Sequence, residues 1–214
     1  VVSVKTGDIH AAATYNNLKK KSGLPAHTHP VFTDLFEPGS TLKPFAVGYA
    51  LDCNPGVEHA IWDTSPGKMT IQGNPIRDVR NYGKLTTEQV LSKSSNIGMV
   101  KIIKSCPRSY SQWLRDTLKV TQRTDIGFPA EPRGQLATAR SDDQLSHATL
   151  SFGYGVSMSI LRLAQYYTAL ANDGRFVPLR LLKGTKLEKK APQIFSVQSA
   201  RKVRKMLVQA VSRT

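Results

Sequence analysis

The chain has 214 residues, of which 40% are hydrophobic, and carries 30 Lys and Arg against 15 Asp and Glu, a net charge of +15. This length suits one large domain or two small ones, with enough apolar material for a core without disulfides. No apolar run is long enough to cross a bilayer. The charge fits a solvated surface as well as an anionic partner, and without an RNA-binding or zinc-finger signature it does not indicate nucleic acid.

The first elements predicted along the chain are short. Residues 1–15 read as a strand pair around the turn Lys5-Thr6-Gly7-Asp8. Residues 16–33, rich in Lys, His and Pro, read as an exposed loop. A turn at Glu37-Pro38-Gly39 precedes an apolar helix from Ser40 to about Asp52, with Pro44 in the first turn, where a missing N–H matters little.

The middle of the chain alternates turns and helices. Scattered Pro and Gly over residues 53–84 predict an irregular segment with short hairpin strands. Thr86 to Gln89 has capping-box spacing and opens a helix to about Lys93. Further helices are predicted over Ile97–Lys104 and Ser109–Leu118, before a Gly- and Pro-rich connection at residues 127–134.

Two helices are predicted in the last third. Apolar residues from Ile160 onward repeat at helical spacing, and Asn172-Asp173-Gly174 closes that helix. The last helix begins near Ser196 and buries an apolar stripe, leaving the basic residues at its start to form a solvated face. The stripe is Val203, Met206, Leu207 and Ala210, and the basic residues are Arg201, Lys202, Arg204 and Lys205.

Catalytic chemistry is indicated by Ser40-Thr41-Leu42-Lys43. Positions i and i+3 share one face of a helix, so the Lys43 amine can reach the Ser40 hydroxyl. Serine is a poor nucleophile until a base removes its proton, and a buried lysine with a lowered pKa can serve as that base. By itself the spacing is common and also fits a capped helix with a surface lysine.

A second element, Ser94-Ser95-Asn96, favours the catalytic interpretation of Ser40 and Lys43 over a simple capped helix. It lies between two predicted helices and offers a hydroxyl that can relay a proton and an amide that can bind a substrate backbone. S-x-x-K followed by a triplet of this type is the order found in penicillin-binding proteins and class A β-lactamases.

Longer stretches resemble the class B penicillin-binding proteins. The segments at 36–45 and 93–98 are similar to the nucleophile segment and the second motif of that family, and Val4 to Ile9 resembles the start of its transpeptidase domain. Ser151-Phe152-Gly153-Tyr154-Gly155 and the helix after it resemble the cell-division (septal) branch. Elongation-type relatives are expected to carry Asp in place of Asn96.

The resemblance implies the α/β fold of penicillin-recognising serine transferases, a helical subdomain beside an antiparallel sheet. Residues 1–214 are expected to be part of one transpeptidase domain that supplies the helices and only the first strands. The third motif of the family, K-T-G, follows the second in the chain, so Lys5-Thr6-Gly7 is predicted to be only a turn. The true third motif, and the C-terminal strands that carry it, are expected beyond Thr214.

The family's roles carry over to four residues. Ser40 is the nucleophile, Lys43 the base, Ser94 the proton relay and Asn96 a ligand of the acyl side chain. Tyr154 is predicted to line the cleft, with simple packing as the alternative. The implied substrate is the D-Ala-D-Ala end of peptidoglycan stem peptides, with β-lactams as acylating inhibitors.

The family also implies a setting and leaves alternatives open. It suggests a periplasmic domain anchored to the inner membrane by one helix outside this chain, divisome membrane proteins as partners, and neither metal nor cofactor. A catalytically inactive peptidoglycan- or divisome-binding homologue, or a β-lactam sensor, would share the same motifs. Glu131-Pro132 superficially resembles the deacylating loop of β-lactamases, although its setting fits a transpeptidase.

Cys53 and Cys106 follow the far ends of the two helices that begin at the motifs. A disulfide between them is permitted in the periplasm, and two unpaired thiols are the alternative.

Overall fold

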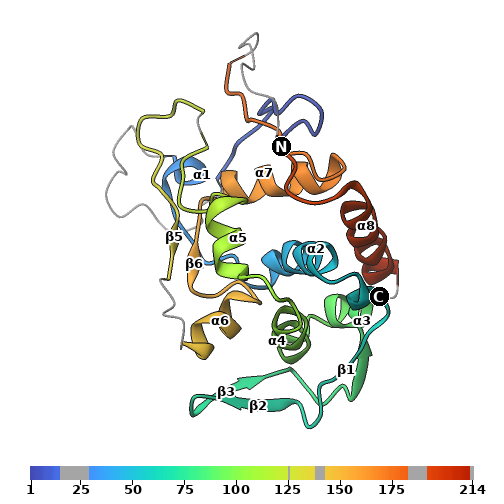
Figure 1. Cartoon of the computed structure of the whole chain (residues 1–214). Helices are drawn as coiled ribbons and strands as arrows, with labels where there is room; N and C mark the ends of the chain where they lie inside the picture. Colours follow the sequence, from blue (N-terminus) through green and yellow to red (C-terminus); the bar gives the residue numbers. More distant parts are fainter. Residues whose placement is uncertain (15–28, 125, 138–142, 183–191, 213–214) are drawn as a thin grey trace.

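The computed structural model describes the whole chain except residues 15–28, 125, 138–142, 183–191 and 213–214, and it is a mixed assembly of helices and small sheets (Figure 1). The helices are α1 Pro30–Thr33, η1 Gly39–Leu42, α2 Lys43–Cys53, η2 Pro55–His59, α3 Thr87–Ser92, α4 Asn96–Lys104, α5 Tyr110–Asp116, α6 Gln144–Leu150, α7 Ile160–Ala171 and α8 Val197–Ser212. The strands are β1 Ile61–Asp63, β2 Lys68–Ile71, β3 Asn74–Arg77, β4 Lys84–Thr86, β5 Gln135–Leu136 and β6 Val156–Ser157.

Helix α2 is the centre of the core. Its residues from Lys43 to Leu51 are all buried, because α3, α4 and α8 pack around it (Figure 1). Gly48 permits the close approach of Phe195, since a Cβ at position 48 would lie 2.7 Å from that ring. A helix buried on every side is expected to be apolar all round, so the buried charge of Lys43 needs a specific explanation.

The strands form three separate antiparallel pairs. β1 pairs with β4, β2 with β3, and β5 with β6. The hairpin predicted within residues 53–84 is therefore confirmed, with Met69 opposite Ile76 in its register. Ile71 and Ile76 are the buried side chains of this hairpin, and they pack with Ile97 and Val100 of α4.

The strand pair predicted at residues 1–15 is present only as a short antiparallel pairing, and no full strand forms in the described part. In the described part of that segment a single antiparallel bridge joins Val2 to Ile9, and Asp8 bridges in parallel to Arg180. The Arg180 guanidinium also lies 2.7 Å from the Asp8 carboxylate. The segment is thus held by a distant part of the chain. The turn predicted around Lys5-Thr6-Gly7 is confirmed, and Gly7 has a φ of 73°.

Most predicted helices are confirmed with small shifts of their ends. The Thr86 capping box is complete: the Gln89 backbone N–H donates to the Thr86 hydroxyl, and the Thr86 N–H donates to the Gln89 side chain. Two short helices were missed. α1 lies within the predicted loop 16–33, of which residues 16–28 are outside the described residues, and α6 follows an Asp143 N-cap.

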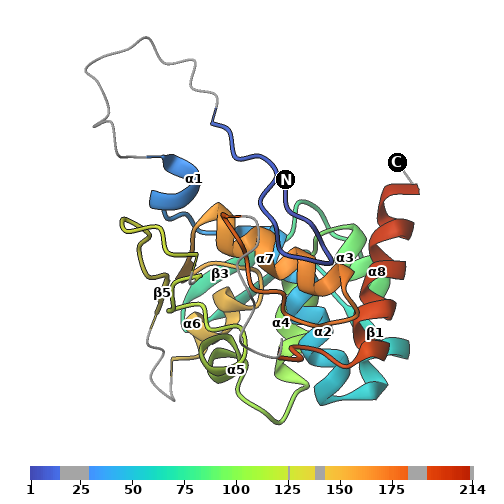
Figure 2. The same ribbon diagram turned by 90° about the horizontal axis from the view of Figure 1, so that it is seen from above.

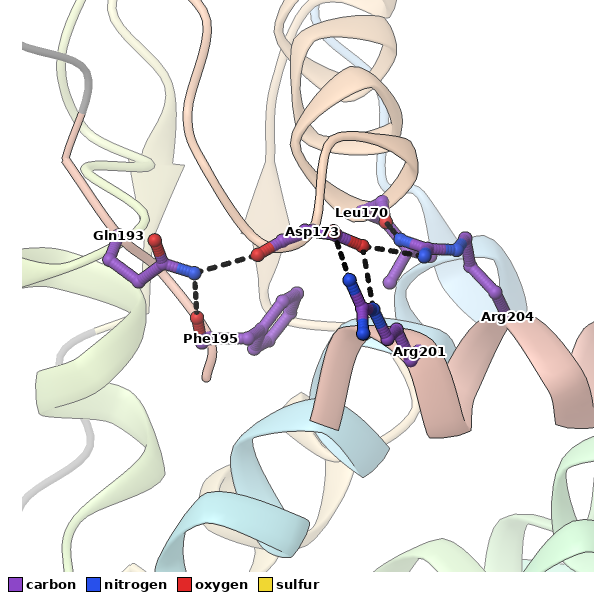
Figure 3. Close-up of polar contacts among 6 residues, drawn as sticks. All are labelled: Leu170, Asp173, Gln193, Phe195, Arg201 and Arg204. Atoms are coloured by element: carbon purple, nitrogen blue, oxygen red, sulfur yellow. Dashed lines mark hydrogen bonds and ion pairs between the residues drawn. The ribbon is translucent and has the colours of Figure 1, made fainter. Parts of the chain in front are cut away.

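Helix α8 is tied to the rest of the molecule by its basic residues, as Figure 3 shows. Arg201 and Arg204 both pair with Asp173, at 3.0 and 2.6 Å, and Arg204 also donates to the Leu170 carbonyl at the end of α7. Lys202 pairs with Glu58 at 2.5 Å. The prediction of a simply solvated basic face is therefore wrong for these three residues. Figure 2 shows α8 running along the side of the molecule occupied by α3.

Cys53 and Cys106 are unpaired thiols, each half-buried against the core. Of the two predicted alternatives, a disulfide or two unpaired thiols, the structure has the unpaired thiols. Burial is the main cause that raises the pKa of the Cys106 thiol, and the neighbouring Cys53 adds to it.

Candidate active site

The turn before Ser40 is clamped by a distant segment, residues 153–158. The Gly39 N–H donates to the Gly153 carbonyl at 3.1 Å, and the Gly155 N–H donates to the Glu37 carboxylate at 2.8 Å. Phe36 and Met158 exchange backbone hydrogen bonds at 3.0 Å. Gly39 has a φ of 53°, a left-handed conformation that glycine adopts at no steric cost. The chain thereby reverses direction and enters the helix with Ser40 exposed.

Ser40 and Lys43 occupy the first turn of continuous helix formed by η1 and α2. The Lys43 N–H donates to the Ser40 carbonyl, and Pro44 fits within the first positions of α2 as predicted. Their placement differs sharply, because Ser40 is exposed while only 1% of Lys43 is accessible to solvent. The nucleophile candidate therefore faces solvent, and the base candidate lies beneath it.

The Lys43 amine uses three hydrogen bonds. Nζ donates to the Ser94 carbonyl at 2.6 Å, to the Ser94 hydroxyl at 2.9 Å and to the Asn96 side-chain oxygen at 2.8 Å. Burial lowers the pKa of Lys43 to about 8, and the negative charge of Asp78 acts in the opposite direction. A neutral amine is then accessible close to neutral pH, which a general base requires.

Ser94 connects Lys43 to Ser40. Its hydroxyl lies 3.0 Å from the Ser40 hydroxyl, so Lys43 Nζ, Ser94 Oγ and Ser40 Oγ form a continuous chain. Ser94 has a φ of 54°, which is unusual for a residue other than glycine. This conformation turns both its carbonyl and its hydroxyl toward Lys43. The direct Lys43–Ser40 contact predicted from helix spacing is not among the hydrogen bonds of Lys43.

Asp78 holds the second motif in place. Its carboxylate accepts from the Asn96 N–H at 2.6 Å, the Ile97 N–H at 3.1 Å and the Ser95 hydroxyl at 2.6 Å. The Asn96 amide also donates to the Arg77 carbonyl at 3.1 Å. An acid at the start of α4 caps free N–H groups and is favoured by the helix dipole. Asp78 thus orients the side-chain oxygen that Asn96 presents to Lys43.

Four of the five predicted site residues come together: Ser40, Lys43, Ser94 and Asn96. Tyr154 lies on the segment that clamps the nucleophile turn, and its ring is 51% exposed and packs edge-on to Phe152. Within the described residues no hydrogen bond joins Tyr154 to the other four. Asp78 was missed, because nothing in its local sequence marks it and its partners, Ser95 to Ile97, lie 17–19 residues further along the chain.

Other candidates from the sequence lie apart from this cluster. Lys5-Thr6-Gly7 forms a turn whose Gly7 carbonyl accepts from the Arg180 N–H. Glu131 is buried, and its carboxylate accepts from the Thr124 N–H, a structural role. Among the described residues no group of three His, Cys, Asp or Glu gathers as a metal site, and no described helix is long and apolar enough to span a membrane.

Fold and site together define a mixed helix-and-sheet domain with a serine nucleophile candidate connected to a buried lysine. A family model described as "Penicillin binding protein transpeptidase domain" matches residues 1–214. The chain therefore belongs to the penicillin-binding protein transpeptidase domain family, which confirms the family predicted from the motifs.

Named relatives agree with this assignment. The chain is 36% identical over 212 residues to the "Probable peptidoglycan D,D-transpeptidase PbpC" of Pseudomonas aeruginosa, covering 97% of this chain and 37% of that protein. It is 35% identical over 190 residues to the "Peptidoglycan D,D-transpeptidase FtsI" of Escherichia coli, covering 86% of this chain and 32% of that protein. The chain thus spans about a third of the length of these curated relatives.

A solved structure supports the fold. The transpeptidase domain of Burkholderia pseudomallei penicillin-binding protein 3, in its apo form, superposes with a TM-score of 0.82 at 35% identity, covering 98% of this chain and 60% of that one. The predicted fold class is confirmed.

Proposed function

We propose that this chain is the nucleophile-bearing part of a peptidoglycan D,D-transpeptidase that cross-links stem peptides through an acyl-enzyme on Ser40. The observation that carries the proposal is the chain of hydrogen bonds from buried Lys43 through Ser94 to exposed Ser40. A buried amine with a lowered pKa has no structural purpose in a core helix, whereas an acyl-transfer enzyme needs one.

In the acylation step, Ser40 Oγ forms a bond to the carbonyl carbon of the penultimate D-Ala. Neutral Lys43 takes the Ser40 proton through the Ser94 hydroxyl, which can both accept and donate. As the C–N bond breaks, the proton passes back through Ser94 to the amine of the departing D-Ala. An acceptor amine from a neighbouring stem peptide then attacks the ester, loses its proton by the same route and releases Ser40.

Substrate positioning falls to neighbouring groups. The Ser40 N–H at the start of the helix supplies one donor for the developing oxyanion. Asn96 binds the acyl side chain, and Tyr154 borders the cleft from the clamping segment. The family's third motif, which follows the second in the chain, would supply the second oxyanion donor and hold the substrate carboxylate.

The relative named FtsI and the resemblance of residues 151–155 to the septal branch support a role in septal wall synthesis. On this proposal the domain works in the periplasm, anchored to the inner membrane by a helix outside this chain, with divisome membrane proteins as partners. β-Lactams acylate the same serine and block it.

The test is intact mass after incubation with a penicillin, on this chain and on a version extended beyond Thr214 by its natural sequence. We expect a stable adduct on the extended protein. Ser40→Ala should abolish the adduct, and Lys43→Met should slow its formation by about 10²–10⁴-fold, the usual contribution of a general base.

Lys68→Met is the matched control for Lys43→Met, because Lys68 is an exposed lysine of β2 outside the site, and this variant should acylate normally. If the extended, folded protein never acylates, the enzyme proposal fails and a role as an inactive peptidoglycan-binding homologue replaces it. Rapid release of the adduct would instead indicate a β-lactam hydrolase.

A further inference from the structure

A basic cavity lies at the far end of α4 from the catalytic serine. Helix α4 begins at Asn96 beside Lys43 and ends at Lys104, about 12 Å away at the usual helical rise. There α4, α5, α6 and the loop at residues 107–109 line an open cavity of about 590 Å³. That volume is within the range of ligand sites, and none of the four catalytic candidates lines it.

The rim of this cavity carries positive charge. Lys104, Arg108 and Arg115 line it and are exposed, and His147 of α6 lines it half-buried. Within the described part of the chain none of these three cations is in an ion pair, in contrast to Arg201 and Arg204 of α8. Cations that face a cavity without an internal counter-charge are suited to binding an anion.

The cavity is also free of lining acids, as far as the described residues go. A second cavity, beside α8, is lined by Glu58 and Glu88, and a third, near Tyr49, by Asp52 and Asp116. The acid nearest to His147 in the sequence, Asp143, does not line the basic cavity, and its carboxylate is engaged by the Ser146 N–H and hydroxyl. Lys104 and Arg115 therefore face no described acid in the lining of this cavity, whereas Arg108 also lines the third cavity, with its Asp52 and Asp116.

The lining is not purely polar. Ile103 of α4 is half-buried and presents apolar surface to the cavity, with the almost fully buried Val100, Ala148 and Leu150 behind it. A free phosphate or a nucleic-acid backbone would use the rim and leave this apolar surface uncovered. A peptide with acidic side chains on either side of an apolar one would use both.

We propose that this cavity binds an acidic peptide segment of a partner protein, with one apolar side chain against α4 and α6 and carboxylates at Lys104, Arg108 and Arg115. The site is separate from Ser40, so binding here does not compete with a stem peptide at the catalytic serine.

The test is fluorescence anisotropy with the labelled peptide Glu-Leu-Glu-Leu at about 50 mM salt, where charge interactions are weakly screened. We expect binding that weakens at least about tenfold for Gln-Leu-Gln-Leu and for Glu-Ser-Glu-Ser. The double variant Arg108→Glu/Arg115→Glu should lose affinity by a similar factor. The matched control Lys5→Glu/Lys68→Glu makes the same charge change at exposed sites outside the cavity and should keep its affinity within about twofold.

Each other outcome overturns the proposal. If the Glu and Gln peptides bind with equal affinity, the cavity does not recognise the carboxylates. If both double variants lose affinity equally, the net charge of the protein alone attracts the peptide. If inorganic phosphate displaces the peptide at comparable concentration and Glu-Ser-Glu-Ser binds as well, the cavity is a general anion site. Melting curves for both double variants exclude unfolding as the cause.

Discussion

The buried amine of Lys43 sets the acid–base behaviour of the site. Two influences on its pKa oppose each other. Burial favours the neutral amine, whereas the negative charge of the Asp78 carboxylate favours the protonated amine. Asp78 itself accepts three hydrogen bonds from residues 95–97. Burial is the larger, so the pKa falls from 10.5 to about 8. Roughly a quarter of the lysine is then neutral at about pH 7.5, against about a thousandth for an unperturbed lysine.

The first prediction is the pH dependence of Ser40 acylation in the extended protein. The base must be neutral, so the rate should rise about tenfold per pH unit from about pH 6 and level off above about pH 8. Stopped-flow measurement with a chromogenic β-lactam gives this profile. A rate that keeps rising to about pH 10 would show that burial does not depress the pKa of Lys43.

Asp78→Asn provides the control for that profile. The asparagine keeps an acceptor for the Asn96 N–H but removes the negative charge that favours protonated Lys43. The midpoint of the profile should therefore move to lower pH. A midpoint that moves upward would mean that Asp78 acts on Lys43 through geometry and not through charge.

A sequence motif identifies a site residue only when that residue lies within the motif. Ser40, Lys43, Ser94 and Asn96 were predictable because each belongs to a short pattern with a chemical reason for its spacing. Asp78 and Glu37 were not assigned roles, because their partners, Asn96 and Gly155, come from other parts of the chain. The proposed relay through Ser94 depends on the left-handed backbone of that residue, which sequence alone does not indicate.

At the level of elements, the turn before Ser40 depends on close contact with the turn at Gly153. A Cβ added at position 153 would lie 2.0 Å from the Gly39 carbonyl oxygen, and the φ of 88° is already unfavourable for alanine. We predict that Gly153→Ala displaces Gly39 and slows acylation of the extended protein by at least about tenfold, because a small misplacement of a nucleophile is costly. The measurement is the same β-lactam assay.

Gly73→Ala is the matched control for backbone strain. Gly73 has a similar φ of 78°, but no atom lies within 4 Å of its added Cβ. Both variants should lose about 1–2 kcal/mol of stability from the left-handed backbone alone. Normal acylation by Gly153→Ala would show that the contact with Gly39 does not position Ser40.

A second prediction at this level concerns the attachment of α8 to the end of α7. Hydrogen bonds from Arg201 and Arg204 lower the pKa of Asp173 from 3.8 to about 2. A depressed carboxyl pKa contributes stability above the unfolded value, and this contribution is lost as pH falls toward the folded value. Asp173→Asn should therefore melt at lower temperature at neutral pH, with the gap to the wild type narrowing from about pH 5 to about pH 3.

The control for this variant is Asp116→Asn, which removes an exposed acid that makes no described ion pair. It should melt close to the wild type across the same pH range. A gap for Asp173→Asn that widens in acid would contradict the assigned role of the two arginines.

Helices were easier to predict than the contacts between them. The Thr86 capping box and the apolar spacing after Ile160 are local signals, and both helices formed as expected. The seven-residue α6 offered too short a pattern. The basic residues of α8 were misassigned because their partners, Asp173 and Glu58, are remote in sequence, and a helical pattern shows which face is polar but not what it meets.

For the molecule as a whole, the imbalance of charge is the dominant electrostatic fact. With 30 basic and 15 acidic side chains, the excess positive charges repel one another in the compact state. Salt shortens the range of this repulsion, since the Debye length is about 10 Å at about 0.1 M. Close pairs such as Arg204 with Asp173 are weakened by salt as well, but they involve few of the charges.

We therefore predict that the melting temperature rises when NaCl is increased from about 20 to about 200 mM, by about 2–4 °C for each kcal/mol of repulsion removed. Each Lys→Glu change removes two charges, so Lys5→Glu/Lys68→Glu takes the net charge from +15 to +11. That variant should show a smaller rise, because less repulsion remains to be screened. A melting temperature that falls with salt would mean that the ion pairs holding α8 outweigh the net charge, and it would move the main electrostatic determinant of stability from the whole molecule to that one helix.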